Sequence, residues 1–393
     1  MVKGQIEVSM RGLFKTLNTM KIDKVRVLNQ DEYGPRVVEI KTNKVNFETP
    51  DRAVTSTEGN YKKQVRALDD PFLHSIFESI AHFANENLQE LHTRNGPFAK
   101  RKTALSSQVR DYSDSDMITK FYPQMKKDSC VSVEDARTLA DLQRYCGYDL
   151  ITILDLSPNS PVEEFEKHIT KMNEKFISPF TDAEPIPYID MAMDHDLFKK
   201  KVDAIWDNNG TFKVMGVIFR SPPLHMANYM YLQKNNDRDI WIHASGVNRY
   251  YQKNWTTSQI HIPQIYGIDT VSILSQRIGG EPISKPVEKI KRYDPKSLGI
   301  IEVKKHREKY GTNLDCDCPV CENKNLNQAI EKYTVNHKGE IDIALLDIWF
   351  KLHESFSSYS EFEEGRKYIK KDEFGDYLTE KEHLSKVIRD FKK

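Results

Sequence analysis

The sequence has few cysteines, no excess of charge of either sign and no long apolar segment. Only five cysteines occur in 393 residues, and 58 Lys and Arg balance 58 Asp and Glu, which argues against a nonspecific polyanion binder. No run of about 18 apolar residues could span a bilayer, and we find no cationic and apolar leader at the amino terminus. Together with reduced cysteines, this composition predicts a cytoplasmic protein with no membrane partner.

Several well-known motifs of nucleotide and hydrolase chemistry are also missing. The sequence contains no Walker loop, no G-x-G-x-x-G, no nucleophile-elbow serine and no H-E-x-x-H. The chemistry of this chain must therefore be sought in other residues.

What is present is a tight group of cysteines. Cys316, Cys318 and Cys321 form a C-x-C-x₂-C cluster that holds three of the five cysteines within six residues. Cysteines so close in sequence cannot be bridged comfortably by a disulfide. The spacing predicts a structural Zn²⁺ site that needs one further ligand, the alternative being three unrelated thiols.

Three downstream residues could supply the fourth ligand. His337 lies in an expected turn, whereas Asp347 and His353 lie on an expected helix over 341–356. A helix gives a ligand a fixed direction, and tetrahedral zinc accepts either nitrogen or oxygen. We expect His353, with Asp347 and His337 as the alternatives.

The middle of the chain alternates between helix and strand patterns. Ser132 to Asp135 is a capping-box-like helix start, Gly147 ends that helix, and residues 149–155 are a near-continuous apolar run typical of a buried parallel strand. The same alternation predicts helices over 162–176, 195–207 and 226–234 and strands over 186–190, 213–219, 239–244 and 267–274. Units of this length favour an α/β fold, a (β/α)₈ barrel of the TIM type, over a doubly wound sheet.

The remaining segments complete the predicted organisation. Residues 1–50 alternate apolar and polar positions and predict an N-terminal β extension, residues 70–98 have helical spacing, and residues 100–127 resemble a loop. We therefore expect the barrel over 51–300 and a C-terminal zinc-binding subdomain over 301–356. The charged helical tail, 357–393, carries aromatic residues that could stack on nucleic-acid bases or anchor the helix to the core.

Polar and glycine residues lie where the expected strands end. In a barrel the chemistry sits at the carboxyl ends of the strands. Each position also has a structural interpretation, because Asp155 could cap a turn and His243 could be a hydrogen-bonded core residue. The strand-end positions are Asp155, Asp190, Gly216, His243, Ala244, Ser245, Gly246 and Asp269.

A barrel followed by this cysteine cluster resembles the tRNA-guanine transglycosylase family. The zinc motif over 317–321 is the most specific part of the likeness, which extends over about residues 45–356. The barrel segments that agree in order are 45–50, 147–155, 243–247 and 267–269.

The resemblance implies an enzyme that exchanges a guanine in a nucleic acid for a 7-deazaguanine through a covalent aspartate–ribose intermediate. It implies tRNA as the favoured polymer, with DNA as the alternative because relatives insert 7-deazaguanines into DNA, and a homodimer or heterodimer formed through the zinc region. Guanine or the 7-deazaguanine would be held by Asp155, Asp190, Gly216, Ala244, Ser245 and Gly246.

The sequence departs from the family at the catalytic positions. Ser272 stands where the family has its nucleophilic aspartate, and the nearest match to the Asp-Ser-Gly acid–base segment is Asp114-Ser115-Asp116. We therefore expect Asp269 or another strand-end carboxylate as the nucleophile and Asp114 or Asp116 as the acid and base. A non-catalytic relative that binds nucleic acid or a catalytic partner subunit is the alternative, and a metal-stabilised barrel of unrelated function is a third.

Overall fold

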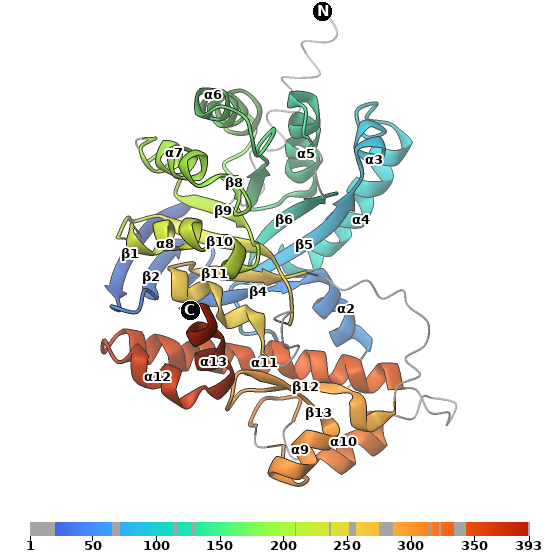
Figure 1. The fold of residues 1–393 in the computed structure, drawn as a ribbon. Coiled ribbons are helices and arrows are strands. Elements are labelled where there is room, and N and C mark those ends of the chain that lie inside the picture. Colours follow the sequence, from blue (N-terminus) through green and yellow to red (C-terminus); the bar gives the residue numbers. More distant parts are fainter. Residues whose placement is uncertain are drawn as a thin grey trace, which may run out of the picture.

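Eight parallel strands close into a barrel in the computed structural model, in the order β10-β11-β4-β5-β6-β7-β8-β9 (Figure 1). The structure describes residues 20–64, 71–113, 116–126, 130–208, 210–235, 237–250, 257–274, 286–314, 316–321, 324–333 and 343–391. The closed barrel confirms the predicted (β/α)₈ fold. Its strands are β4 (Asp51–Thr55), β5 (Ile76–Phe83), β6 (Ile118–Met125), β7 (Leu150–Ile153), β8 (Glu184–Asp190), β9 (Val214–Ile218), β10 (Trp241–Val247) and β11 (Thr270–Ile273).

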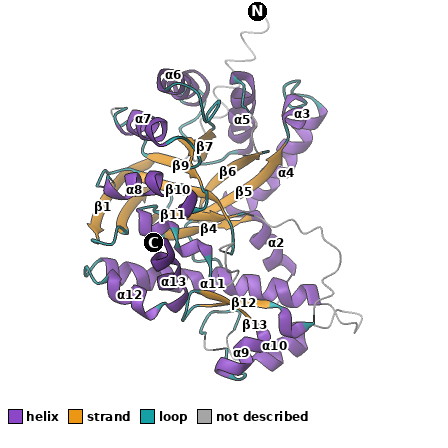
Figure 2. Ribbon diagram, in the orientation of Figure 1, coloured by secondary structure: helices purple, strands orange, loops and turns teal. Residues whose placement is uncertain are grey.

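Helices surround the barrel between its strands (Figure 2). The predicted capping box of α5 is present, because Ser132 Oγ accepts from Asp135 N while Asp135 Oδ2 accepts from Ser132 N, and Gly147 ends the helix with φ of 79°. The helices that follow β4 to β9 are α2 (Ser56–Gln64), α3 (Asn85–Gln89), α4 (Gly96–Ser113), α5 (Val133–Cys146), α6 (Val162–Met172), α7 (His195–Trp206) and α8 (Met226–Lys234). The helices predicted in the middle of the chain are thus confirmed.

Two predictions for the first half of the chain are wrong. The segment 70–98, expected to be helical, contains strand β5, and the loop expected over 100–127 consists mostly of α4 and β6. Both strands are buried on both faces, and each carries a charged residue inside the barrel, Glu78 in β5 and Lys120 in β6. A charge in the middle of a strand interrupts the apolar run that normally identifies a buried strand.

The N-terminal extension is a three-stranded antiparallel sheet of β1 (Ile22–Gln30), β2 (Arg36–Thr42) and β3 (Asn46–Glu48), as the alternation predicted. It covers the amino end of the barrel. Ile22 N donates to Glu184 Oε1 at the start of β8 (3.1 Å), and Val27 N donates to Asp239 Oδ1 just before β10 (2.9 Å).

A small module follows β11 and precedes the long helix α11 (Ile343–Ile369). The module contains β12 (Lys291–Asp294), β13 (Gly299–Glu302), α9 (Val303–Tyr310) and α10 (Leu326–Tyr333), and α12 (Phe374–Glu380) and α13 (Glu382–Phe391) end the chain. Figure 1 shows α11 between the barrel and this module, and it contacts β4 and α2 on one side and β12 and α10 on the other.

Helix α11 extends beyond the predicted end at residue 356 and crosses the boundary expected between the zinc-binding subdomain and the tail. Its barrel-facing side packs against β4 and α2. Phe362 and Phe374 of the predicted tail are buried, which supports the interpretation of these two aromatic residues as core anchors.

A buried ion pair joins the N-terminal sheet to the barrel. Arg36 in β2 donates through Nε and Nη2 to the two carboxylate oxygens of Asp269, at 2.9 and 2.6 Å, and both side chains are fully buried. Ile242 N also donates to Asp269 Oδ2 (2.6 Å). Asp269 immediately precedes β11 and therefore lies at the amino end of the barrel, away from the carboxyl ends of the strands.

We expect Asp269→Asn to lower the free energy of unfolding by about 3–5 kcal/mol, because it leaves the Arg36 guanidinium buried without a counter-ion. Denaturant unfolding followed by tryptophan fluorescence measures this loss. Asp207→Asn is the matched control: Asp207 pairs with Arg238 at the surface, where such a pair contributes less than about 1 kcal/mol. Equal effects of the two substitutions would contradict the structural role of Asp269.

Candidate metal centre and barrel lumen

The side chains of Cys316, Cys318, Cys321 and His353 converge on one point. Their ligand atoms all lie within 4.8 Å of one another. His353 Nδ1 is 3.6, 3.4 and 3.2 Å from the sulfurs of Cys316, Cys318 and Cys321. A tetrahedral metal with bonds of about 2.3 Å to sulfur and about 2.0 Å to nitrogen separates these atoms by roughly 3.5 Å. The donor atoms therefore have the spacing that one metal ion requires.

Local structure holds these donors in place. Cys321 N donates to Cys318 O (2.9 Å) in a tight turn that brings the two thiols together. The buried His353 donates from Nε2 to Tyr293 O (2.9 Å), so that Nδ1 is left facing the sulfurs.

The fourth donor of the cluster is His353, as predicted. Asp347, on the same helix, is instead paired with Lys351 (2.6 Å). His337 lies outside the described residues. The donor set of three sulfurs and one imidazole nitrogen fits a thiophilic divalent ion.

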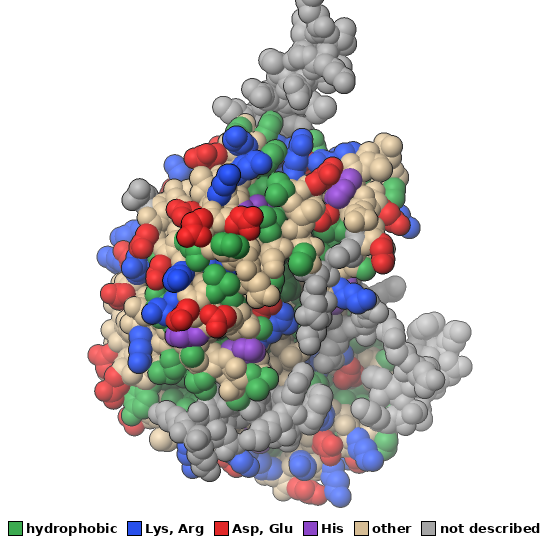
Figure 3. All heavy atoms as spheres, turned by 45° about the horizontal axis from the view of Figure 1, so that its top comes forward, with side chains coloured by type: hydrophobic (Ala, Val, Ile, Leu, Met, Phe, Trp, Pro, Cys, Tyr) green, Lys and Arg blue, Asp and Glu red, His purple; other side chains and the backbone are tan. Residues whose placement is uncertain are grey.

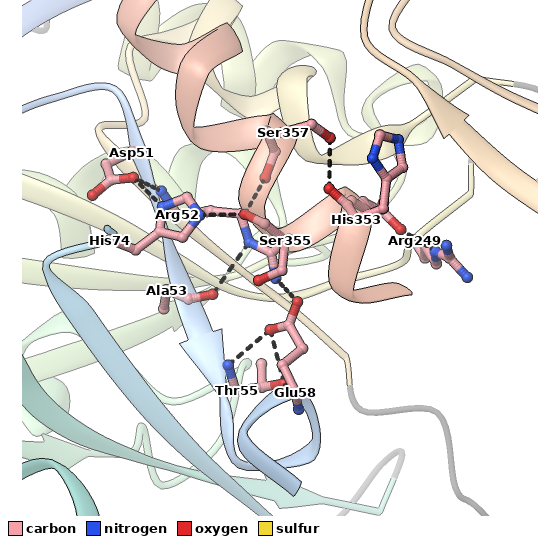
Figure 4. A network of polar contacts seen from close by, with 12 residues as sticks. Asp51, Arg52, Ala53, Thr55, Glu58, His74, Arg249, His353, Ser355 and Ser357 are labelled. Carbon is pink, nitrogen blue, oxygen red and sulfur yellow. Dashed lines mark hydrogen bonds and ion pairs between the residues drawn. The ribbon is translucent and has the colours of Figure 1, made fainter. Parts of the chain in front are cut away.

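Helix α11 connects this cluster to the barrel (Figure 4). One residue after His353, Glu354 forms an ion pair with Arg249, which follows β10. The next carbonyl, Ser355 O, is hydrogen-bonded to His74 Nε2 (2.8 Å), and His74 Nδ1 is 2.6 Å from Asp51 Oδ1 at the start of β4. The helix that supplies the fourth donor is thus bonded to the barrel at consecutive residues.

The barrel lumen contains a second polar cluster, centred on Glu78. Ser272 Oγ in β11 donates to Glu78 Oε1 (2.7 Å), while Ser245 Oγ and His243 Nε2 in β10 lie 3.0 Å from Oε2. The Lys120 ammonium forms an ion pair with Glu78 and donates to Ser245 Oγ (3.0 Å). All five side chains are buried.

The charges of this cluster follow from its burial and its pairing. Burial alone would raise the pKa of Glu78, but the Lys120 cation and the hydrogen bond from His243 outweigh burial and lower that pKa to about 2. Burial and the nearby Lys120 cation lower the pKa of His243 to about 4. At neutral pH the lumen therefore holds an anionic carboxylate beside a neutral imidazole.

Two tyrosines lie beside the cluster, with the Lys120 ammonium 5.7 and 5.0 Å from the ring centres of Tyr122 and Tyr188. The hydroxyl of Tyr188 lies 2.7 Å from Ser245 Oγ, and the rings of Tyr122 and Tyr188 stack with centroids 5.8 Å apart. The Tyr188 ring lies so close to Gly216 that a Cβ there would be 2.2 Å from the ring. Only glycine at 216 leaves room for this ring.

The expected substrate-binding residues lie in different surroundings. Gly216 and Ser245 face the lumen. Gly246 has a φ of 85°, and a Cβ built at this position would lie 3.8 Å from the Tyr122 hydroxyl. Ala244 is buried between His243 and Ser245, and strand alternation turns its side chain away from the lumen.

The two expected substrate-binding carboxylates each have a cationic partner. Asp155 accepts from the buried Lys201 of α7 (2.6 Å), which ties the loop after β7 to the outer helices. Asp190 ends β8 and is held by Arg220 at 2.8 and 2.5 Å, and the Arg220 side chain is 41% exposed. Both carboxylates are thus mostly buried in ion pairs, and the pairs differ in the cation, which is buried for Asp155 and partly exposed for Asp190.

Of the expected catalytic residues, the structure describes Asp269 and Asp116, and Asp116 lies just before β6 at the amino end of the barrel. Asp269 lies at the amino end of the barrel with both carboxylate oxygens bound, a position that does not suit a nucleophile at the opposite end. Asp114 lies outside the described residues. Glu78 and Lys120 were missed because the segments that carry them were not recognised as strands; the β-branched and aromatic neighbours Ile76, Phe77, Ile118, Thr119, Phe121 and Tyr122 were the available signal.

A large cavity lies at the amino end of the barrel. Its volume is about 1210 Å³, and its walls include Phe72 and His74 before β5, Tyr112 of α4 and Tyr359 and Arg366 of α11. None of the residues that line this cavity belongs to the lumen cluster or to the metal donors.

Among the described helices, none is long and apolar enough to cross a membrane.

We expect the purified protein to bind one divalent metal ion per chain, and Cys318→Ala or His353→Ala to abolish that binding and destabilise the fold by several kcal/mol. Elemental analysis and thermal unfolding test this. Cys130→Ala is the control, because Cys130 is an exposed cysteine outside the cluster. Metal content that survives Cys318→Ala would show that the cluster is not the metal site.

We also expect Gly216→Ala to destabilise the fold by about 1–3 kcal/mol, because the new methyl overlaps the Tyr188 ring. In a Tyr188→Val background the ring is absent, and Gly216→Ala should lower the free energy of unfolding much less. A double-mutant cycle in denaturant measures this coupling. Additive effects would show that the ring does not rest on Gly216.

Comparisons with known proteins provide little further information. No family model matches the chain, and no curated protein matches it. Among solved structures, the chain is similar to a putative phosphonomutase from Burkholderia cenocepacia J2315, with 14% sequence identity over 56% of this chain and 84% of that chain and a TM-score of 0.35.

Proposed function

We propose that this protein is a transglycosylase that exchanges a guanine base in a nucleic acid for a 7-deazaguanine, with tRNA as the favoured polymer and DNA as the alternative. The observation that supports this proposal is the combination of a closed (β/α)₈ barrel with a Cys₃His cluster. It was this combination of barrel and cysteine cluster that made the sequence resemble the tRNA-guanine transglycosylases.

The metal in this proposal is a structural zinc ion. Three thiolates and one imidazole nitrogen are the four donors of a closed tetrahedral zinc site, which leaves no position for a substrate or a water. Zinc would stabilise the C-terminal module and take no part in the reaction. Cys316, Cys318, Cys321 and His353 would hold it.

Base exchange needs a carboxylate in the lumen and polar groups at its mouth. Glu78 supplies a buried, ionised carboxylate inside the barrel, and the Asp190–Arg220 pair supplies polar groups, of which Arg220 is partly exposed. On the face in Figure 3, basic and acidic side chains are interspersed, in keeping with the balanced charge of the chain. A binder of this kind would recognise an extruded base rather than the polyanion as a whole.

A non-catalytic relative is the second candidate, and two observations favour it. The Tyr188 ring rests on Gly216, where a base was expected, and Ser272 replaces the expected nucleophilic aspartate. In that case the protein would bind nucleic acid or pair with a catalytic subunit, with the zinc region as the contact surface.

We expect the zinc-loaded protein to incorporate radiolabelled guanine into tRNA, or into duplex or single-stranded DNA if DNA is the substrate. Asp190→Asn should weaken incorporation mainly through a higher KM, because Asp190 lies where the base would enter. Asp207→Asn, a surface carboxylate changed in the same way, should leave incorporation unchanged. If no polymer is labelled, the catalytic proposal fails and gel-shift binding to the same polymers tests the second candidate.

A further inference from the structure

We propose that Glu78 is the nucleophile of this enzyme and replaces the missing aspartate at position 272 from a different strand. The inference rests on the proposed base exchange. Ser272 is the residue that stands in the expected nucleophile position, and its Oγ donates to Glu78 Oε1 at 2.7 Å. The Glu78 carboxylate therefore lies close to the place that an aspartate side chain at position 272 would fill.

The strand order explains how Glu78 reaches this place. β5 and β11 flank β4 in the barrel, so Glu78 and Ser272 approach each other across one intervening strand. Glutamate has one methylene more than aspartate, and this extra length carries its carboxylate across the lumen. Serine at 272 is small enough to leave room for the carboxylate and also holds it by a hydrogen bond.

The neighbours of Glu78 keep its carboxylate ionised and oriented. Lys120 pairs with it, and Ser245 and His243 hold Oε2 at 3.0 Å each. The low pKa of Glu78, about 2, agrees with an anion at neutral pH. Oxygen Oε1 has only the Ser272 hydroxyl as a hydrogen-bond partner among the described residues, so Oε1 is the oxygen that can attack.

The reaction uses two side chains of this cluster, Glu78 and Lys120. Oε1 of Glu78 forms a bond to ribose C1′ while the C1′–N9 bond breaks, and its electron pair leaves with the guanine. The guanine takes a proton from the Lys120 ammonium, which loses its counter-ion as the ester forms and thus becomes a stronger acid. The incoming base returns its N9 proton to Lys120, attacks C1′ and releases the Glu78 carboxylate.

The two stacked tyrosines determine access to the carboxylate. The Lys120 ammonium that pairs with Glu78 lies 5.7 and 5.0 Å from the centres of the Tyr122 and Tyr188 rings, and the Tyr188 ring rests on Gly216. When these rings turn away, the flat slot on Gly216 becomes available to a purine of similar thickness. The reacting ribose then lies above the Glu78–Ser272 pair.

The test is to identify the residue that becomes attached to the polynucleotide. Zinc-loaded wild-type protein is incubated with the polymer that it labels, free guanine is removed, and the adduct is denatured, digested and mapped by mass spectrometry. We expect the adduct on the peptide that contains Glu78. An adduct on any other residue overturns the assignment while leaving base exchange intact.

Two variants give an independent test. Glu78→Gln should lower exchange by on the order of 10³-fold or more. Because Glu78→Gln leaves Lys120 without a counter-ion, its folding is checked by zinc content and thermal unfolding. Adding Ser272→Asp to Glu78→Gln returns a carboxylate to the same place, and we expect it to recover part of the exchange and to move the adduct to residue 272.

The outcomes separate this inference from the proposed function. Exchange by the wild type that persists in a folded Glu78→Gln variant overturns the role of Glu78 alone. Exchange by neither the wild type nor the double variant, with any of the polymers, overturns the proposed function and the nucleophile together.

Discussion

The structure depends on one helix that belongs to two parts of the molecule. α11 carries His353, the donor that completes the metal cluster, and the two residues that follow are bonded to Arg249 and His74 of the barrel. The same helix packs against β4 of the barrel. A metal ion bound by the cluster would therefore fix the position of a helix that also packs against β4 and α2 of the barrel.

The lumen is the other place where the structure departs from an ordinary barrel core. A core of branched apolar side chains would fill this space at a lower cost in free energy than Glu78, Lys120 and His243 do. Burying charges costs free energy even when they are paired. Every polar atom of Glu78 has a partner, and neutral hydroxyls from β10 and β11 complete its surroundings. The network lies next to Gly216, where the absence of a side chain leaves room for the Tyr188 ring.

The metal cluster and the second half of the barrel could be predicted from local sequence patterns. The C-x-C-x₂-C spacing sets the distances between the thiols, and α5 has its capping residues in the sequence itself. The first half of the barrel was not recognised in the sequence, because the charged residues Glu78 and Lys120 interrupt the apolar runs of β5 and β6. Glu78, the carboxylate inside the lumen, was not among the expected site residues for the same reason, because it lies in a segment that did not resemble a strand.

Sequence alone thus determined the fold class, the N-terminal hairpin strands and the thiol donors of the metal cluster, since these depend on spacing within a few residues. Tertiary structure decided which of three candidates is the fourth donor, that Asp269 is buried against Arg36 at the amino end, and that Glu78 meets Ser272. Each of these depends on contacts between residues far apart in the chain. The partner of a buried charge is selected by how elements far apart in the chain pack together, and no local pattern encodes that packing.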